Sequence, residues 1–245
     1  MRSSNRFVAP EILDSLSPSD PRAIRSRGDL RRLHWLMGSA GILGENIDTL
    51  WQAHPPQRIL ELGAGDGTLM LRVAQKLAPL PGGVELVLLD RHALVTQATV
   101  DAYAVIGWTA RVVTLDVLDW ARDPVDQTYD FCVASLFLHH FGTEEIRVLL
   151  RAIEARVGAF LACEPRRNIL SSFASRLVAL VGANSVTRAD AVASVAAGFA
   201  GRELSALWPA TPPRWELCEY PARGFSHCFS AARTTISRAE DHRAD

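Results

Sequence analysis

The chain has 245 residues, a formal net charge of −1 and a sequence pI of about 6.7, and 48% of its residues are hydrophobic. Its length fits one large α/β domain, or one domain with a small helical addition. The near-neutral charge argues against nucleic acid as a partner, because nucleic-acid-binding surfaces are strongly basic. No window approaches the ~18 uninterrupted apolar residues of a membrane span, and residues 1–10 lack the apolar core of a signal peptide. We therefore expect a cytoplasmic protein without a membrane span.

The chain contains four cysteines, and none of them belongs to a C-x-x-C pair. They are Cys132, Cys163, Cys218 and Cys228. All four fall in apolar stretches, which predicts buried, reduced thiols rather than disulfides or a metal site. Reduced thiols agree with a cytoplasmic location.

Residues 1–55 are predicted to form a lead and a helical cap. The first twenty residues are polar and include two prolines, which predicts a flexible or loosely packed lead. Asp29 is placed to cap the apolar helix that follows it, and a second helix is predicted over 45–52. A His-Pro-Pro sequence then marks the boundary with the next part of the chain.

From residue 56 onward, short apolar strands alternate with helices. The strands are predicted at residues 58–62, 84–89, 111–115, 129–134 and 158–163, and the helices at 69–77, 93–103 and 143–156. Thr143 is placed to cap the last of these helices. Such alternation is typical of βαβ units on a parallel sheet, with right-handed crossovers that put helices on both faces.

The C-terminal part of the chain has a different pattern. Helices are predicted over 168–181, 188–199 and 203–208, followed by an antiparallel hairpin with strands at 215–220 and 225–232. The polar residues 237–245 are predicted to be a disordered tail. The predicted fold class is therefore α/β, with a doubly wound, Rossmann-like sheet and a closing antiparallel strand.

The most informative feature is the glycine-rich turn after the first strand, Glu61-Leu62-Gly63-Ala64-Gly65-Asp66-Gly67. Glycines at alternate positions let the chain turn tightly and let a ligand lie against bare backbone. The turn also lies at the carboxyl end of a strand, where open α/β sheets bind their ligands. A purely structural turn is the plain alternative.

The spacing and the charge of this turn indicate its ligand. The G-x-G-x-G spacing differs from the G-x-G-x-x-G of dinucleotide-binding turns, which seat a pyrophosphate on a helix N-terminus. Glu61 and Asp66 would repel a pyrophosphate and attract a ligand with an ammonium group. S-adenosylmethionine has an ammonium, a sulfonium and no phosphate. The turn therefore predicts S-adenosylmethionine as the cofactor, with S-adenosylhomocysteine as its product.

Two further carboxylates follow the second and third strands. Asp90 can accept hydrogen bonds from a ribose diol, or it can cap the next helix. Asp116 could accept a hydrogen bond from the adenine amino group, and Asp119 is a competing candidate for that role. Trp120 could pack on the adenine or belong to the core.

The fourth strand is expected to end near Ser135, in the sequence Ser-Leu-Phe-Leu-His-His-Phe. His139 and His140 then pass close to the ligand, and both are candidate catalytic bases because histidine takes up a proton near neutral pH. One of them could instead orient the next helix. Glu164, after the fifth strand, could orient a histidine, bind the substrate or pair with the arginines that follow it. No metal site is predicted, because no third ligand occurs at a fixed spacing.

These residues together resemble the class I S-adenosylmethionine-dependent methyltransferases. The segments Asp29-Leu30-Arg31-Arg32-Leu33 and Ser185-Val186-Thr187-Arg188-Ala189-Asp190 also resemble bacterial small-molecule methyltransferases that are associated with type III polyketide synthases. The likeness covers about residues 20–235. The chain departs from that family at Ala189, where histidine is common, and at Cys163-Glu164, where Asn-Asp is common.

The resemblance implies a seven-stranded sheet with the last strand antiparallel, and a methyltransferase domain over residues 56–236. It also implies that the N-terminal helices cover the cofactor and that an insertion at 168–208 walls the substrate pocket. The cofactor site it implies consists of Glu61, Gly63, Ala64, Gly65, Gly67, Asp90, Arg91, Asp116, Val117 and Ser135.

The predicted function is methyl transfer to a hydroxyl or an activated carbon of a small molecule, such as a polyketide phenol or quinone of secondary metabolism. One alternative is an NAD(P)-dependent oxidoreductase, although the chain lacks a Tyr-x-x-x-Lys signature. Another is a non-catalytic protein that binds the cofactor. The near-neutral charge disfavours RNA as the acceptor, and the lack of an Asn-Pro-Pro-Tyr-type segment disfavours amide or base-amine targets. The choice between monomer and homodimer is left open.

Overall fold

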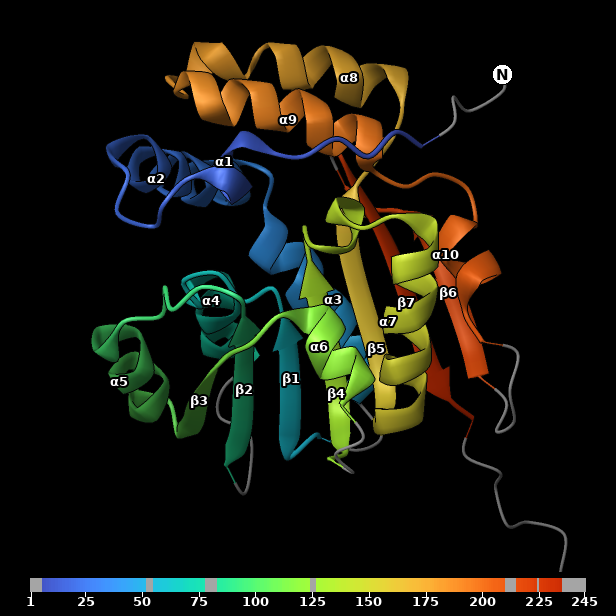
Figure 1. The fold of residues 1–245 in the computed structure, drawn as a ribbon. Helices are drawn as coiled ribbons and strands as arrows, with labels where there is room; N and C mark the ends of the chain where they lie inside the picture. Colours follow the sequence, from blue (N-terminus) through green and yellow to red (C-terminus); the bar gives the residue numbers. More distant parts are fainter. Residues whose placement is uncertain are drawn as a thin grey trace, which may run out of the picture.

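A computed structural model describes residues 6–51, 55–77, 83–123, 127–209, 215–223 and 225–234. Residue 52, Gly224 of the predicted hairpin turn and the predicted tail at 237–245 lie outside these ranges. The described strands form a seven-stranded sheet in the order β3-β2-β1-β4-β5-β7-β6 (Figure 1). They are β1 (Arg58–Leu62), β2 (Val84–Asp90), β3 (Trp108–Thr114), β4 (Tyr129–Ser135), β5 (Val157–Pro165), β6 (Trp215–Pro221) and β7 (Ser226–Arg233). Of these strands only β7 runs antiparallel, between β5 and β6, which confirms the predicted fold class.

Helices cover both faces of the sheet and the edge at which the parallel strands end (Figure 1). In chain order they are α1 (Ile12–Ser15), α2 (Pro21–Leu36), α3 (Ser39–Trp51), α4 (Thr68–Leu77), α5 (Gln97–Val105), α6 (Val117–Arg122), α7 (Thr143–Arg156), α8 (Ile169–Arg176), α9 (Ser185–Ala197) and α10 (Glu203–Leu207), with 3₁₀ turns η1 (Leu138–His140) and η2 (Val178–Val181). None of the helices described here has the length and apolar character needed to cross a bilayer.

The sheet separates two hydrophobic cores, because successive side chains of a strand point to opposite faces. Leu60 and Val87 pack in the cluster that includes α6, α7 and α10. Their neighbours Ile59 and Leu86 pack in the cluster that includes α3, α4 and α5. Burial on both faces explains why the inner strands are continuously apolar in the sequence.

The carboxyl ends of the parallel strands point toward a separate helical layer, formed by α1, α2, α8 and α9 (Figure 1). Asp190 of α9 accepts hydrogen bonds from the backbone amides of Ile12 and Leu13, at 2.8 and 3.0 Å. Arg6 donates to the carbonyl of Phe141 at 2.7 Å. The prediction of a loosely packed lead is therefore wrong for its described part, because polar tethers from distant elements hold it in place.

Helix α2 begins earlier than the sequence indicates, and Asp29 is not its cap. Asp20 caps the helix by accepting a hydrogen bond from the amide of Arg22 at 2.7 Å. Pro21 occupies the first helical position, where a missing N–H leaves no hydrogen bond unmade. Asp29 lies buried within the helix and accepts a hydrogen bond from the amide of Asn184 at 2.8 Å. Its role is to join α2 to the segment that leads into α9.

Other local predictions are also corrected. Helix α7 is capped at Gly142, whose amide donates to Glu145 at 2.7 Å, so Thr143 is the first helical residue and not the cap. Helix α5 begins at residue 97 rather than 93, because Thr96 caps it. Helix α6 was not predicted, since six residues are too few to show a helical period. Cys218 is exposed on the edge strand β6, whereas the other three cysteines are buried as predicted.

We expect the substitution Asp190→Ala to loosen α1 and leave the sheet intact. The change removes the acceptor of two backbone amides, which is worth about 1–2 kcal/mol. Hydrogen exchange at Ile12 and Leu13 then accelerates about tenfold. Asp119→Ala, at an exposed carboxylate of α6, serves as the control and leaves both rates unchanged. Equal exchange in the two variants would show that Asp190 does not hold α1.

Candidate functional site

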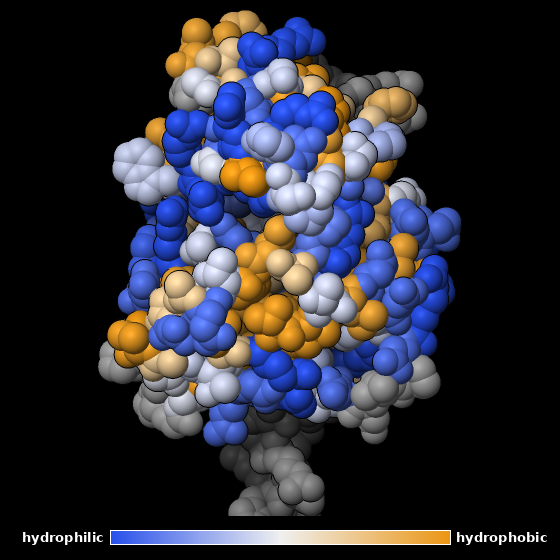
Figure 2. Space-filling view, turned by 60° about the vertical axis from the view of Figure 1, so that its left-hand side comes forward, coloured by the Kyte–Doolittle hydropathy of each residue, from blue (hydrophilic) through white to orange (hydrophobic). Residues whose placement is uncertain are grey.

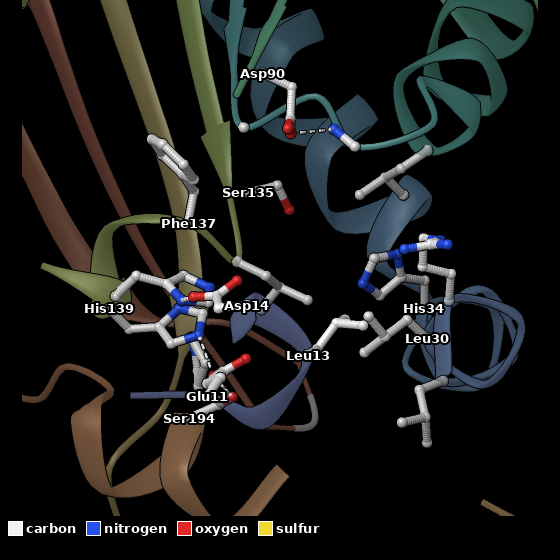
Figure 3. A pocket seen from close by; sticks show the side chains of 18 of the residues that line it. Glu11, Leu13, Asp14, Leu30, His34, Asp90, Ser135, Phe137, His139 and Ser194 are labelled. Carbon is white, nitrogen blue, oxygen red and sulfur yellow. Dashed lines mark hydrogen bonds and ion pairs between the residues drawn. The ribbon is translucent and has the colours of Figure 1, made fainter. Parts of the chain in front are cut away.

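A cavity of about 970 Å³ lies between the carboxyl ends of the strands and the helical layer. Figure 2 shows apolar side chains gathered between the helical layer above and the sheet-bearing part below. Inside the cavity, Leu13 of α1 and Leu30 of α2 lie opposite Asp90 and Ser135 of the sheet (Figure 3). One wall therefore comes from the sheet edge predicted to bind a ligand, and the other comes from the N-terminal helices.

The glycine turn after β1 presents bare backbone to the cavity. Gly63 and Gly65 have φ angles of +70° and +56°, which glycine adopts without strain. A Cβ at Gly63 would lie 2.2 Å from the ring of Phe137, whereas a Cβ at Gly65 would meet no atom within 4 Å. Both glycines line the cavity. Gly67 does not line it, and its carbonyl accepts a hydrogen bond from Tyr103 beneath the turn.

Glu61 is a buried carboxylate that faces the cavity. It is 4% exposed, and its Oε2 has no hydrogen-bond partner among the described residues. Burial, together with the negative charges of Asp66 and Asp90, raises the pKa of this carboxyl to about 8. An unpaired buried carboxylate is unfavourable, and a cationic group on a ligand would relieve the penalty.

Asp90 holds the glycine turn in place. Its Oδ2 accepts a hydrogen bond from the amide of Gly65 at 2.8 Å, and its Oδ1 accepts one from the amide of His92 at 2.8 Å (Figure 3). Each carboxylate oxygen has a second lone pair. Asp90 can therefore fix the turn and also accept hydrogen bonds from ligand hydroxyls. It does not cap α5, which Thr96 caps.

The end of β3 contributes a further acidic group. Asp116 caps α6 and, with Val117, lines the cavity. The competing candidate Asp119 is exposed and lies outside the cavity lining. Trp120 is buried in the core, where the guanidinium of Arg156 lies 4.7 Å from its ring centroid, so it is a core residue.

Two ion pairs join the helical layer to the sheet. Arg31 of α2 pairs with Asp66 at 2.9 Å, and Arg91 pairs with Asp14 at 2.8 Å. Such partly exposed pairs add little stability, but they set the relative position of the two walls. Of the two carboxylates that flank the glycine turn, Asp66 is thus engaged by an arginine, while Glu61 faces the cavity unpaired.

Two histidines form one end of the site together with the carboxylates of Glu11 and Asp14 (Figure 3), and the carboxylate of Glu164 lies behind them. His139 is buried, with Nδ1 2.8 Å from Glu164 Oε2 and Nε2 3.4 Å from Glu11 Oε1. The Nδ1 of His140 lies 3.2 Å from Asp14 Oδ2. Burial by itself lowers the pKa of His139, but the hydrogen bonds to Glu11 and Glu164 outweigh burial and raise it to about 9.

Glu164 supports this cluster from behind the cavity wall. Its Oε1 accepts hydrogen bonds from the amides of Phe137 and Leu138, at 3.1 and 2.9 Å, and its Oε2 accepts one from the amide of His139 at 3.3 Å. The carboxylate is fully buried and is not among the residues that line the cavity. These contacts orient His139 and the turn that carries it.

The turn after β4 is strained where it meets the cavity. Leu136 has a φ of +51°, the one positive value among the described non-glycine residues. Its amide donates to the carbonyl of Cys163 at 2.8 Å, which holds this conformation. The turn brings Ser135 to the cavity wall and places Phe137 against Gly63. Backbone strain of this kind clusters at binding sites.

Solved structures with a similar fold include methyltransferases. The plantazolicin methyltransferase BpumL in complex with SAH has a TM-score of 0.60 at 13% identity, over 88% of this chain and 92% of that chain. The mitomycin 7-O-methyltransferase MmcR has a TM-score of 0.59 at 15% identity, over 91% of this chain and 60% of that chain. No protein-family model and no curated protein matches the sequence. The chain has the methyltransferase fold.

The sequence analysis missed several polar residues of this cavity, and three of them, Glu11, Asp14 and His34, carry ionisable side chains from the N-terminal segment. All three belong to the N-terminal segment, which was expected to be a lead and a cap. Burial lowers the pKa of His34 to about 4, so this side chain is neutral at neutral pH. Nothing local marks these residues, because they reach the site only through the packing of α1 and α2.

We expect Glu61→Gln to raise the melting temperature of the ligand-free protein at pH 8–9 and to change it little near pH 4. The pKa of the carboxyl rises from 4.5 to about 8 in the folded chain, so stability is lost as pH rises through this interval. At pH 7 the raised pKa of Glu61 lowers the free energy of unfolding by on the order of 3 kcal/mol, at about 1.4 kcal/mol per pKa unit. The glutamine amide of the variant is also buried, and the cost of burying it does not depend on pH. Melting curves against pH measure the effect, with Glu216→Gln at an exposed site of β6 as the control. A pH-independent difference would contradict the assignment.

Proposed function

We propose that this protein transfers a methyl group from S-adenosylmethionine to a hydroxyl or an activated carbon of a small molecule. The observation that carries the proposal is the unpaired carboxylate of Glu61 beside the bare glycine turn. A ligand at this point needs a cationic group and no phosphate, because Asp66 and Asp90 are also close. The methionine part of S-adenosylmethionine has this character, and the methyltransferase fold supports the same conclusion.

The residues of the sheet wall fit this cofactor. We assign the ammonium group to Glu61, and the open space beside Gly65 leaves room for the methionine chain. The missing side chain of Gly63 lets the ring of Phe137 pack against the turn. We assign the ribose hydroxyls to Asp90 and the adenine amino group to Asp116, which both line the cavity. The remaining residues proposed to line this part are Ala64, Arg91, Val117 and Ser135. Gly67 contributes through the shape of the turn.

When bound, the sulfonium of the cofactor supplies an electrophilic methyl group. The work of the protein is then to hold the acceptor next to that group and to receive the proton that a hydroxyl acceptor loses. Positioning supplies a large part of the rate in such reactions. The cluster around His139 and His140 lies in the cavity wall and is the group we propose for activating the acceptor. Because the pKa of His139 is about 9, that ring is already protonated near neutral pH, so we propose His140 as the residue that receives the proton. Glu164 positions the turn that carries both histidines.

The cavity favours a largely apolar acceptor with a polar group at one end. A volume of about 970 Å³ is near the upper end of the ~300–1,000 Å³ range of ligand pockets, so a cofactor and a small acceptor can share it. Leu13, Leu30 and Met37 supply apolar surface, and the histidines supply the polar end. A polyketide phenol or quinone of secondary metabolism has this character. Among the structural neighbours, BpumL is named a plantazolicin methyltransferase and MmcR a mitomycin 7-O-methyltransferase.

An NAD(P)-dependent oxidoreductase is the main alternative, and two observations argue against it. Dinucleotide-binding sheets have the strand order 3-2-1-4-5-6, whereas here an antiparallel β7 lies between β5 and β6. A pyrophosphate at the glycine turn would also face Glu61, Asp66 and Asp90, with strong repulsion in a partly buried site. A non-catalytic cofactor-binding protein would bind the same nucleoside and differ in turnover.

Calorimetric titration with S-adenosylhomocysteine, and with NADH as the control, tests the proposed function. We expect the nucleoside to bind and NADH not to bind. Because the pKa of Glu61 is about 8 in the ligand-free protein, an ammonium that binds at pH 7 converts the acid to its carboxylate and releases protons. The apparent enthalpy therefore depends on the ionisation enthalpy of the buffer, and Glu61→Gln removes that dependence. Binding of NADH alone would overturn the proposal.

The substitution Gly65→Val is expected to abolish binding of S-adenosylhomocysteine, because its side chain enters the space of the cofactor. Gly107→Val is a matched control, since Gly107 also has a positive φ, of +80°, and open space at its Cβ, but lies outside the cavity. Both variants carry similar backbone strain, so they should lose similar stability. Equal affinities in both variants would place the cofactor elsewhere.

A further inference from the structure

The proposed function leaves unexplained why two histidines meet carboxylates from the N-terminal segment, more than 120 residues away in the sequence. Glu11, His139 and His140 each offer a ligand atom, and these three atoms lie within 4.8 Å of one another. Spacing along the chain gave no sign of this set, because Glu11 joins the histidines only through the packing of the N-terminal segment. We propose that these three residues bind a divalent transition-metal ion, and that Zn²⁺ is the best match.

The distances suit shared coordination of one ion. His139 Nε2 lies 3.4 Å from Glu11 Oε1. Two ligands bound at about 2.0–2.2 Å to one tetrahedral Zn²⁺ are separated by about 3.4 Å. A cation at this point replaces the hydrogen bond between the imidazole and the carboxylate. His140 completes the set with a small shift of its partly buried side chain, whose ring centroid is 4.3 Å from that of His139.

The groups behind the three ligands have the arrangement that metal sites use. A histidine that binds a metal commonly donates its other ring N–H to a carboxylate, which fixes the orientation of the ring. His139 has Glu164 at its Nδ1, and His140 has Asp14 at its Nδ1. In each ring Nε2 then remains as the nitrogen that could bind an ion, and in His139 it is the nitrogen that lies 3.4 Å from Glu11. Glu11 is held as well, because the hydroxyl of Ser194 donates to it.

The site is reachable and has room for further ligands. All three residues line the main cavity, and a second hollow of about 500 Å³ also reaches Glu11 and His140. Three protein ligands leave at least one coordination position open, as in catalytic zinc sites. Two imidazoles with one carboxylate favour Zn²⁺ or a similar transition metal over Mg²⁺, which prefers oxygen ligands.

The consequence for catalysis rests on the proposed function, whereas the metal site itself does not. A cation in the open end of the cluster polarises the hydroxyl of the acceptor and favours loss of its proton to water. The oxygen keeps the electron pair and uses it to bond the methyl carbon, while the bond from that carbon to sulfur breaks and its electron pair stays on sulfur. The two histidines then act as ligands, and His140 is no longer the base.

Metal titration of the purified full chain, freed of metal with a chelator, tests the inference. We expect one equivalent of Zn²⁺ to bind, with Mg²⁺ at least ~100-fold weaker. Glu11→Gln and His140→Gln remove ligands and weaken Zn²⁺ binding by more than ~100-fold, and Asp14→Asn weakens it by about 10–100-fold. His34→Gln removes a histidine of the same cavity outside the cluster and leaves the Zn²⁺ affinity unchanged.

A second measurement distinguishes this site from binding at cysteines. The cobalt-substituted protein should show the d–d absorption of a nitrogen and oxygen site, without the intense near-ultraviolet band of a thiolate ligand. A thiolate band, or equal Zn²⁺ affinity in Glu11→Gln and the parent protein, would overturn the inference. Affinity for S-adenosylhomocysteine, measured in the same variants, keeps the two proposals apart. Nucleoside binding without metal binding rejects only the metal site, and metal binding without nucleoside binding rejects only the proposed function.

Discussion

The carboxylate of Glu164 is fully buried, and a buried charge must be paired or hydrogen-bonded to persist. Its partners are three successive backbone amides of the turn after β4 and the Nδ1 of His139. These contacts decide the path of the turn. That path sets the strained backbone of Leu136 and the packing of Phe137 on Gly63. The cofactor side and the acceptor side of the cavity thus depend on the same buried group.

Glu61 is the counterpart of Glu164 in this fold. Both are buried carboxylates toward the carboxyl ends of parallel strands, yet Glu164 is saturated with hydrogen bonds while an oxygen of Glu61 has none among the described residues. The first arrangement stabilises the ligand-free protein, and the second weakens it. A group that is unfavourable until a ligand arrives is typical of binding sites, where stability is given up for function.

The N-terminal segment shows how much of the site depends on long-range contacts. Helix α1 has four residues, too few to be stable on its own. It forms because Asp190 accepts the amides of Ile12 and Leu13 and because the Arg6 side chain reaches the backbone of η1. This docking delivers Glu11 and Asp14 to the histidines. Helix α1 and the polar cluster are therefore one structural unit. A change that loosens α1 also separates Glu11 and Asp14 from the histidines.

The order of strands and helices follows from the sequence, because hydrophobic period and turn residues are local properties of the chain. So does the position of the glycine turn, Asp90 and Asp116, since the ends of parallel strands meet at one edge of a sheet. The start of α2 was predicted wrongly at Asp29, although Asp20 followed by Pro21 is itself a local signal for a helix start. Asp29 instead accepts a hydrogen bond from the amide of Asn184, which only the tertiary fold brings near.

The charge state and the partners of the site depend on the folded chain. Glu61 and Asp66 look alike in the sequence, but Arg31, 35 residues from Asp66, engages only the latter. The sequence placed two histidines side by side and offered Glu164, at the end of a neighbouring strand, to orient one of them, which the structure confirms. Their other carboxylate partners, Glu11 and Asp14, come from the N-terminal segment. Contacts between such distant residues leave no trace in local spacing, because the tertiary fold alone brings them within hydrogen-bond distance.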